Sequence, residues 1–462
     1  FMFRRFFDEG LAQTSYLIAC ERTRQAAIID PRRDVDGYVA AAGQHGLSIT
    51  HAIETHVHAD FVSGARELAT LGASTVAGPG AGLTYALEAY TEAIDGQTLR
   101  LGDVELTFLH TPGHTPEHIS VLARQPDAPV RLFTGDTLFV GAVGRPDLLG
   151  ESMMRDLADK LYDSLFKRLL ALPDDVQVHP GHGAGSLCGA GIGNDPHSTI
   201  GQERRFNPLL QYDSREAFRS AVLADLPDTP TYFARMKRVN REGPPLLGLS
   251  REIEPPPPVI ASAAADGVAG GAWLLDLRPA AAYGAGHPAG AINMAFGPKL
   301  GYWAGWLIPA DVPIFLMGDG GAGQAADARR QLLRVGLDSV AGHVDGGFAA
   351  WRGAGLPVHQ LEQISAAELR ARHLLPGEIA LIDVRSHREW RIDHVPGALH
   401  IPLGELASRT AGVPRGGVVA TMCEGGYRSS LAASLLERDG VGNLVNVVGG
   451  MNAWRLVERA RT

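Results

Sequence analysis

Four short motifs that carry His or Asp constrain the fold of the first half of this chain most strongly. Each follows a short apolar run of β-forming residues, at 49–53, 104–109, 130–133 and 176–178. The motifs themselves lie at 55–61, 111–114, 134–137 and 179–182. A residue just past the end of a buried strand lies at the rim of a sheet, where an α/β fold places its chemistry. We therefore expect the four strand ends to converge on one metal pocket.

Length and composition indicate a globular protein of several domains. The 462 residues suggest about three domains, and 45% hydrophobic with 20% charged residues fits an ordinary soluble protein. The net charge of −9 argues against nucleic-acid or anionic-membrane partners. The basic, aromatic opening turns acidic at Asp8, which argues against a signal peptide. The three cysteines are too few and too scattered for a disulfide framework, so we expect a reducing, cytoplasmic setting. They are Cys20, Cys188 and Cys423.

A run of four prolines at 255–258 divides the chain. Prolines have no amide hydrogen to donate and favour extended polyproline II, so we expect a linker at 251–258 after a first domain at 1–250. No apolar run approaches the roughly 20 residues that are needed to span a bilayer.

Beyond the prolines, three segments recur at an interval of about one hundred residues, which indicates a duplicated domain. The recurring pairs are 274–279 with 381–386, 286–292 with 393–399, and 345–352 with 448–455. Each copy alternates strands with helices, which predicts a parallel sheet covered on both faces. We expect these α/β domains at 259–360 and 361–462.

The first motif alternates His56, His58 and Asp60 along a loop that leads into a helix. Imidazole nitrogens and carboxylate oxygens suit first-row divalent metals, and alternate spacing turns two histidines one way and the aspartate another. One such motif alone is a weak signal. Three more candidates follow in order, each after a separate strand: His114, Asp136 and His182.

Together the four motifs resemble those of the metallo-β-lactamase superfamily, which has an αββα sandwich fold. The resemblance covers about residues 3–250. Hydrolases of this family such as glyoxalase II carry a His directly after the Asp of the first motif, where it holds a second metal. This sequence has Phe61 there. Phenylalanine has no lone pair for a metal, so the resemblance favours one metal over two.

Residues 132–139 and 144–148 resemble the persulfide dioxygenase branch of that superfamily. The resemblance implies one Fe(II) per chain, with open positions for O2 and a sulfur substrate. The implied ligands are His56, His114 and Asp136. The residues implied around them, which would orient the ligands or metal-bound water, are His58, Asp60 and His182. Water activation by a single metal, and hence thioester hydrolysis, is the competing use of the same residues.

Residues 183–189 and 198–208 resemble longer fusions of a persulfide dioxygenase to rhodanese domains. Glutathione-persulfide enzymes of the branch carry an Arg and a Tyr where this chain has Leu209 and Ala184. The carrier thiol therefore stays open between glutathione, coenzyme A and another small thiol. Cys188 is either a pocket thiol that meets the substrate or a small buried filler. The candidates for substrate binding are Cys188, Arg145 and Arg204.

Near the C-terminus, residues 418–430 run from an apolar strand through a glycine-rich loop into a helix. Inward backbone amides and the helix dipole should stabilise a Cys423 thiolate as a nucleophile, and Arg428 can bind an oxyanion. The loop resembles the rhodanese active site; cysteine phosphatases have a longer loop, so sulfur transfer is favoured over phosphate chemistry. The remaining residues expected in this persulfide cradle are Glu424, Gly425, Gly426, Tyr427 and Ser429.

The first copy has Gly318 and Gly323 where the second has Cys423 and Arg428, so we expect it to be an inactive rhodanese. Its Trp303 and Trp306 belong either to its core, which we favour, or to a contact between domains.

The combined expectation is a bifunctional enzyme of hydrogen sulfide metabolism. The first domain would oxidise a thiol persulfide with O2 to sulfite and thiol. The last domain would pass sulfane sulfur through Cys423 to sulfite and form thiosulfate. A glyoxalase II-like thioester hydrolase fused to a sulfurtransferase is the main alternative, and a non-enzymatic sulfur-relay scaffold is the third. We also expect a homo-oligomer.

Overall fold

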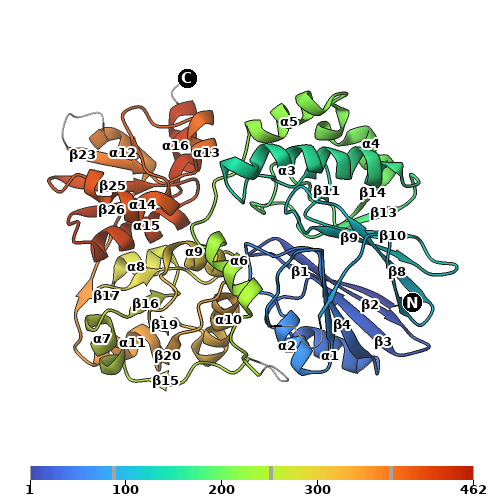
Figure 1. The fold of residues 1–462 in the computed structure, drawn as a ribbon. Helices are drawn as coiled ribbons and strands as arrows, with labels where there is room; N and C mark the ends of the chain where they lie inside the picture. The colour runs from blue at the N-terminus through green and yellow to red at the C-terminus, as the bar shows by residue number, and fades with distance from the viewer. Residues whose placement is uncertain (1, 86–89, 249–252, 374–377, 461–462) are drawn as a thin grey trace. The chain divides into compact units, whose positions relative to one another are not determined.

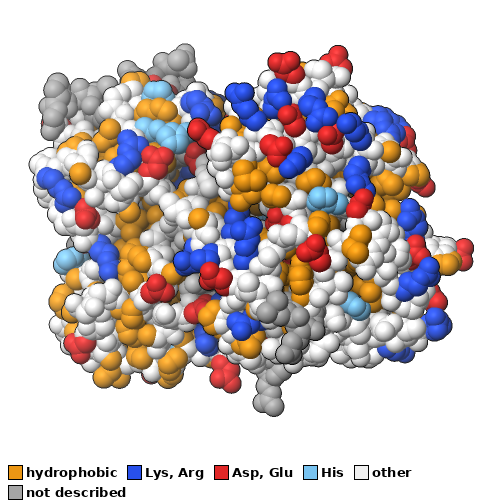
Figure 2. Space-filling view, in the orientation of Figure 1, with side chains coloured by type: hydrophobic (Ala, Val, Ile, Leu, Met, Phe, Trp, Pro, Cys, Tyr) orange, Lys and Arg blue, Asp and Glu red, His pale blue; other side chains and the backbone are white. Residues whose placement is uncertain are grey.

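The computed structural model describes residues 2–85, 90–248, 253–373 and 378–460. Contact clustering gives two compact units, which are described separately below. The first consists of Phe1–Ile253 with Leu333–Gly336, and the second of Glu254–Leu332 with Leu337–Thr462. No described helix is long and apolar enough to cross a membrane. On the face drawn in Figure 2, acidic and basic side chains are interspersed.

The first unit contains two six-stranded sheets (Figure 1). One has the order β1 to β6: Met2–Asp8, Gln13–Cys20, Gln25–Ile29, Ser48–Glu54, Ser74–Ala77 and Tyr90–Glu92. The other has the order β14, β13, β10, β9, β8, β7: Ser198–Thr199, Gln177–Pro180, Arg131–Gly135, Ile119–Arg124, Val104–His110 and Thr98–Leu101. A short hairpin pairs β11 (Leu138–Phe139) with β12 (Ala142–Val143).

Alternation along the strands explains the layering of this unit. In β2, Tyr16 and Ile18 face the core between the sheets, whereas Leu17 and Ala19 pack on the helix side. The helices of the unit are α1 (Asp36–Gln44), α2 (Ala65–Thr70), α3 (Glu151–Asp163), α4 (Ile200–Phe206), α5 (Arg215–Ala224) and α6 (Phe233–Glu242). Side chains of α1 and α2 join the core on the first sheet, and those of α3 and α5 join the core on the second. The predicted αββα sandwich is confirmed.

The second unit contains two five-stranded sheets whose strand pairs are parallel. The sheet of the first copy has the order β15, β20, β19, β16, β18: Pro258–Val259, Val340–Val344, Ile314–Met317, Trp273–Asp276 and Ile292–Asn293. The sheet of the second copy has the order β22, β26, β25, β23, β24: Glu362–Ile364, Leu444–Val447, Val418–Met422, Ile379–Asp383 and Leu399–His400. The predicted pair of parallel α/β copies is confirmed.

Helices flank both sheets of this unit (Figure 1). Those of the first copy are α7 (Ala261–Ala269), α8 (Ala280–Ala285), α9 (Leu300–Leu307), α10 (Gly321–Arg334) and α11 (Gly347–Gly353). Those of the second copy are α12 (Ala366–His373), α13 (His387–Ile392), α14 (Leu406–Arg409), α15 (Tyr427–Arg438) and α16 (Gly450–Arg459).

Two local features differ from a simple reading of the sequence. The proline run is held along β20, because Pro258 lies in β15 and the carbonyls of Pro256 and Pro257 accept hydrogen bonds from His343. Of the two alternatives for the α9 tryptophans, the favoured one, a place in the core, is wrong. Both are only half-buried, and the ring of Trp306 lies against Gly404 of the second copy, where an added Cβ would overlap it.

Candidate functional site

Three of the four strand-end motifs bring His56, His114 and Asp136 together in the first unit. His56 follows β4, His114 follows β8 and Asp136 follows β10. His56 Nε2 lies 3.8 Å and His114 Nε2 lies 3.5 Å from Asp136 Oδ2, and all three side chains are buried. Their ligand atoms are near enough to one another for a single cation.

Hydrogen bonds fix the two imidazoles in the tautomer that a metal needs. The Thr55 hydroxyl donates to Asp30, so it accepts from His56 Nδ1 at 2.9 Å. His114 Nδ1 donates to the Arg145 carbonyl at 2.9 Å. Each imidazole therefore presents its Nε2 lone pair to the centre.

A divalent metal fits this group of atoms. His56 Nε2 and both carboxylate oxygens of Asp136 are buried without a hydrogen-bond partner. Buried polar atoms are nearly always satisfied, so these three atoms indicate a cation-binding site. Two imidazole nitrogens and one carboxylate suit iron or zinc and leave positions for water or substrate.

The electrostatics of the pocket favour the metal-binding protonation states. Burial lowers the pKa of His56 well below its ordinary value, and neighbouring histidines add to this effect. Burial likewise lowers the pKa of His114. Burial raises the pKa of Asp136 to about 6, although His182 opposes the rise. A bound cation would favour the ionised carboxylate.

A second trio shares the Asp136 side of the pocket. His182 Nε2 lies 3.4 Å from Asp60 Oδ2 and 3.6 Å from Asp136 Oδ2, so it is as near to Asp136 as the two predicted ligands are. Its Nδ1 faces the Ala12 carbonyl at 3.2 Å. Cys188 joins Asp60 and His182 within the reach of one cation. The thiol therefore lies in the pocket; burial, then the charges of Asp60 and Asp136, raise its pKa well above the ordinary value.

His58 is oriented differently from the other pocket histidines. Its Nε2 lies 3.1 Å from Asp30 and 3.0 Å from Glu54. Burial opposes the charge on His58, but the two carboxylates raise its pKa well above the ordinary value. The buried Phe61 ring lies 4.3 Å from the His58 ring. His58 therefore belongs to a buried charge cluster beside the metal pocket.

Sequence reasoning missed Asp30, Glu54 and His118. His118 Nε2 accepts the Asp136 amide hydrogen at 3.0 Å, and its ring stacks on His56 at 5.2 Å. The signals available were the strand-end positions of Asp30 and Glu54 and the placement of His118 four residues after His114. A cavity beside His56 and His58 is also lined by Tyr85.

Two arginines predicted to bind substrate are engaged elsewhere. The Arg145 guanidinium is buried and donates to Asp147, to the Leu187 carbonyl and to the Thr229 hydroxyl. Arg204 pairs with Asp174 and donates to the Leu170 carbonyl. We therefore reassign Arg145 to ordering the loop that orients His114, and Arg204 to the surface of α4.

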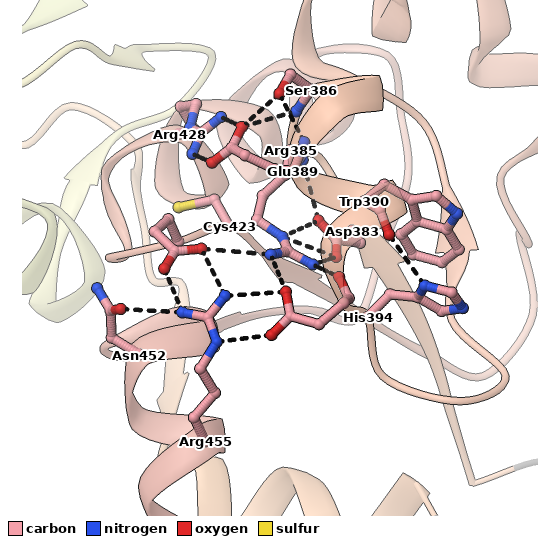
Figure 3. Close-up of polar contacts among 12 residues, drawn as sticks. Asp383, Arg385, Ser386, Glu389, Trp390, His394, Cys423, Arg428, Asn452 and Arg455 are labelled. Atoms are coloured by element: carbon pink, nitrogen blue, oxygen red, sulfur yellow. Dashed lines mark hydrogen bonds and ion pairs between the residues drawn. The ribbon is translucent and has the colours of Figure 1, made fainter.

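The second candidate site surrounds Cys423, which directly follows β25 (Figure 3). Its Sγ accepts the Gly426 amide hydrogen at 3.0 Å, and the Ser429 hydroxyl lies 3.5 Å away. Gly426 has φ 106°, a conformation that favours glycine, and the loop turns there into α15. The sulfur thus lies in the predicted cradle, of which Gly425 is exposed and Tyr427 half-buried.

Arg428 is held by a carboxylate (Figure 3). Its guanidinium donates to both oxygens of Glu389 at 2.7 Å and 2.5 Å. Burial opposes the charge on Glu389, but Arg428 lowers the pKa of Glu389 to about 2. The Glu424 carboxylate is paired in turn with Arg455 and Arg385. The predicted oxyanion clamp is therefore already occupied by a carboxylate of the protein.

The corresponding loop of the first copy is filled by a glutamine. A Cβ added at Gly318 would overlap the Gln324 carboxamide oxygen, which also accepts the Gly320 amide hydrogen at 3.2 Å. The first copy thus has neither the nucleophile nor the space of a cradle.

Comparison with known proteins follows this division of the chain. Residues 8–182 match the metallo-beta-lactamase superfamily, and residues 261–354 and 365–456 each match the rhodanese-like domain. A hydroxyacylglutathione hydrolase from Polaromonas is 33% identical over 49% of this chain and 94% of its own length. The human mitochondrial persulfide dioxygenase ETHE1 is 28% identical over 49% of this chain and 82% of its own.

A crystal structure of a metallo-beta-lactamase from Staphylococcus aureus covers a larger share of the chain. It is 34% identical, spans 74% of this chain and 98% of its own, and superposes with a TM-score of 0.65.

Proposed function

The chain belongs to the metallo-beta-lactamase superfamily and continues into two rhodanese-like domains, and from this premise we propose that it is a bifunctional enzyme of sulfide detoxification. The first domain would oxidise a small-thiol persulfide, and the last would transfer sulfane sulfur. Glutathione and coenzyme A are the candidate carriers, and the proposed setting is cytoplasmic.

The observation that carries the first activity is the close group of His56, His114 and Asp136, in which His56 Nε2 and both Asp136 oxygens have no hydrogen-bond partner. Phe61, next to this group, cannot bind metal. Bound Fe(II) would supply the redox chemistry and a meeting point for O2 and persulfide. In balanced form, one persulfide, one O2 and one water give one thiol, one sulfite and two protons. The relationship to persulfide dioxygenase ETHE1 supports this assignment.

The protein's own residues have separate parts in this step. Thr55 and the Arg145 carbonyl hold the two imidazoles in place. His182 lies within 3.6 Å of Asp136 and within 3.4 Å of Asp60, so His182 and Asp60 can accept the protons that water releases. The Cys188 thiol lies near both residues.

The cradle around Cys423 supports the second activity. The Cys423 thiolate would take the outer sulfur of a second persulfide, which releases one thiol. Sulfite would then attack that outer sulfur, so that thiosulfate leaves and the thiolate is restored. The Gly426 amide stabilises negative charge on the sulfur. Tethering the two domains places the producer of sulfite and its consumer in one chain.

Thioester hydrolysis is the second candidate, favoured by the 33% identity to a hydroxyacylglutathione hydrolase. The trio of Asp60, His182 and Cys188 could hold another metal beside the first, which is the arrangement that hydrolysis by activated water would use.

The test is an iron-loaded full chain in an oxygen electrode with glutathione and coenzyme A persulfides. We expect one O2 consumed for each sulfite formed, and loss of this activity in His114→Ala. His45→Ala, which changes an exposed histidine at the C-terminal end of α1, is the matched control. Zinc content with thioester cleavage and no O2 uptake would support hydrolysis instead. A wild type with neither O2 uptake nor thioester cleavage, whose sulfur transfer is unchanged in His114→Ala, would support a sulfur-relay scaffold.

A further inference from the structure

Outside these two sites, another group of side chains that could bind a metal ion lies where the two rhodanese-like copies meet, within the second compact unit. His287 belongs to β17 (His287–Pro288) of the first copy, and His359 belongs to β21 (Val358–His359). The two strands pair antiparallel with these histidines opposite each other. Glu437, near the end of α15, comes from the second copy. The ligand atoms of the three lie within 4.8 Å of one another.

Both oxygens of Glu437 face an imidazole. His287 Nε2 lies 2.9 Å from Oε2, and His359 Nδ1 lies 2.8 Å from Oε1. His287 is fully buried, whereas the side chain of Glu437 is 24% exposed and that of His359 is 52% exposed. The group is therefore anchored on the inside and open to water on one side, where an ion can enter and water can complete its coordination.

The buried histidine is held as metal-binding histidines usually are. His287 Nδ1 donates to the Tyr283 carbonyl at 2.9 Å, and its ring stacks on Tyr283 at 3.7 Å with an interplanar angle of 7°. The Tyr283 hydroxyl donates to the Ala291 carbonyl at 2.9 Å, which fixes the stacking partner. A ring nitrogen bound to a backbone carbonyl orients the other nitrogen toward a metal.

The hydrogen bonds of this group indicate a position for a positive charge between His287 and Glu437. Because His287 Nδ1 already carries its hydrogen to Tyr283, a neutral ring has a lone pair on Nε2. That lone pair would face the lone pairs of a Glu437 oxygen at 2.9 Å. Either a second proton or a positive ion must lie between them.

We propose that His287, His359 and Glu437 bind one divalent transition-metal ion of the zinc type, with water as the remaining ligand. Two imidazoles and one carboxylate are ligands that zinc takes in proteins. The ion would fasten α15 to the first copy, and α15 begins at Tyr427 in the sulfur cradle. The first copy, through His287 and His359, would thereby supply two of the ligands that hold α15 of the second copy.

Zinc titration of the full chain, with iron already bound in the first unit, tests the proposal. In competition with a chromophoric chelator, we expect the wild type to take up one more zinc than Glu437→Gln or His359→Ala does. Loss of a ligand should weaken binding by more than the roughly 10–100-fold that is typical of losing an outer hydrogen-bond partner. His387→Ala is the matched control, because His387 faces a single carboxylate, Glu405, and should keep the extra zinc.

Cobalt provides an independent measurement. Cobalt(II) in this group should give visible d–d bands without a thiolate charge-transfer band, because none of the three ligands is a cysteine. Cobalt bound beside Cys188 would show that band. We also expect zinc to raise the melting temperature of the wild type but not that of Glu437→Gln. Equal zinc uptake by the wild type and both variants would overturn the proposal and leave Glu437 as an ion-pair partner only. His359 is half exposed, so His359→Ala remains a folded probe if Glu437→Gln is unstable.

Discussion

At Cys423 the sulfur is buried and accepts one backbone amide hydrogen, which is a contact that a nucleophilic sulfur would use. We predict that Cys423→Ser abolishes thiosulfate formation and leaves O2 uptake and sulfite release unchanged. Chromatography of sulfite and thiosulfate, beside an oxygen trace, measures both. Cys20→Ser, at a buried cysteine that contacts Asp103, serves as the control. Thiosulfate at the wild-type rate from Cys423→Ser would refute the sulfur-transfer assignment.

Glu389 gives the second prediction at this scale. Arg428 lowers the pKa of Glu389 to about 2 from its ordinary 4.5, against the effect of burial. The resulting stability is fully present above about pH 4.5 and is lost as the pH falls toward 2. Glu389→Gln should therefore lower the free energy of unfolding by about 1–2 kcal/mol at pH 7, after allowance for solvent screening. This difference between the wild type and the variant should become smaller in acid.

Denaturant unfolding at several pH values, followed by tryptophan fluorescence, measures the difference in the free energy of unfolding between the wild type and Glu389→Gln. Glutamine at this position can still cap α13 with Ser386, so the helix end is preserved. Glu405→Gln, which removes a more exposed ion pair, is the control. If the difference in the free energy of unfolding does not change between pH 7 and pH 3, the ion pair contributes nothing to stability.

At the scale of elements, the loop after β12 approaches the metal pocket closely. A Cβ at Gly144 would overlap the Asp136 carbonyl and press on the His114 side chain. Gly144→Ala should therefore displace both proposed ligands and lower bound iron well below one per chain. Gly37→Ala, in α1 with open space around it, should bind iron normally. Iron content by elemental analysis decides, and normal iron in Gly144→Ala would contradict the proposed ligand set.

The elements also show what the sequence could predict. The strand-end histidines and the glycine-rich loop around Cys423 were predictable because a strand end followed by a turn is a local pattern. The pairing of His58 with Asp30 was not, because Asp30 follows another strand. The pairing with Glu54, four residues away, depends on how the His58 ring turns. Gln324 was missed for the same reason, since nothing local shows that its side chain folds back into its own loop.

At the scale of the whole molecule, the first rhodanese-like copy supports the copy that carries Cys423. The Ser430 hydroxyl of α15 donates to the Asn293 side chain of the first copy at 2.5 Å, and both are buried. Asn293→Ala would leave this hydroxyl buried without its partner, at a cost of about 1–3 kcal/mol. We predict lower stability of the second unit and slower sulfur transfer, with unchanged O2 uptake.

Tryptophan fluorescence is a selective measurement here, because all six tryptophans lie beyond residue 272. Gln360→Ala, an exposed residue that donates to the Ala285 carbonyl, is the control and should unfold as the wild type does. Unchanged unfolding of Asn293→Ala would argue that the first copy is dispensable.

The duplication itself was predictable from the repeated segments. The contact of Trp306 with Gly404 was not, because it joins residues of different copies.

The first copy contacts α15, the helix that begins at the sulfur cradle, at two points: Asn293 near the start of the helix and His287 near its end. A protease nick between the copies should therefore leave a pair of fragments that stay associated and active. When the two fragments are expressed separately and mixed, they should regain sulfur-transfer activity. The first copy would then be needed for the folding of the second.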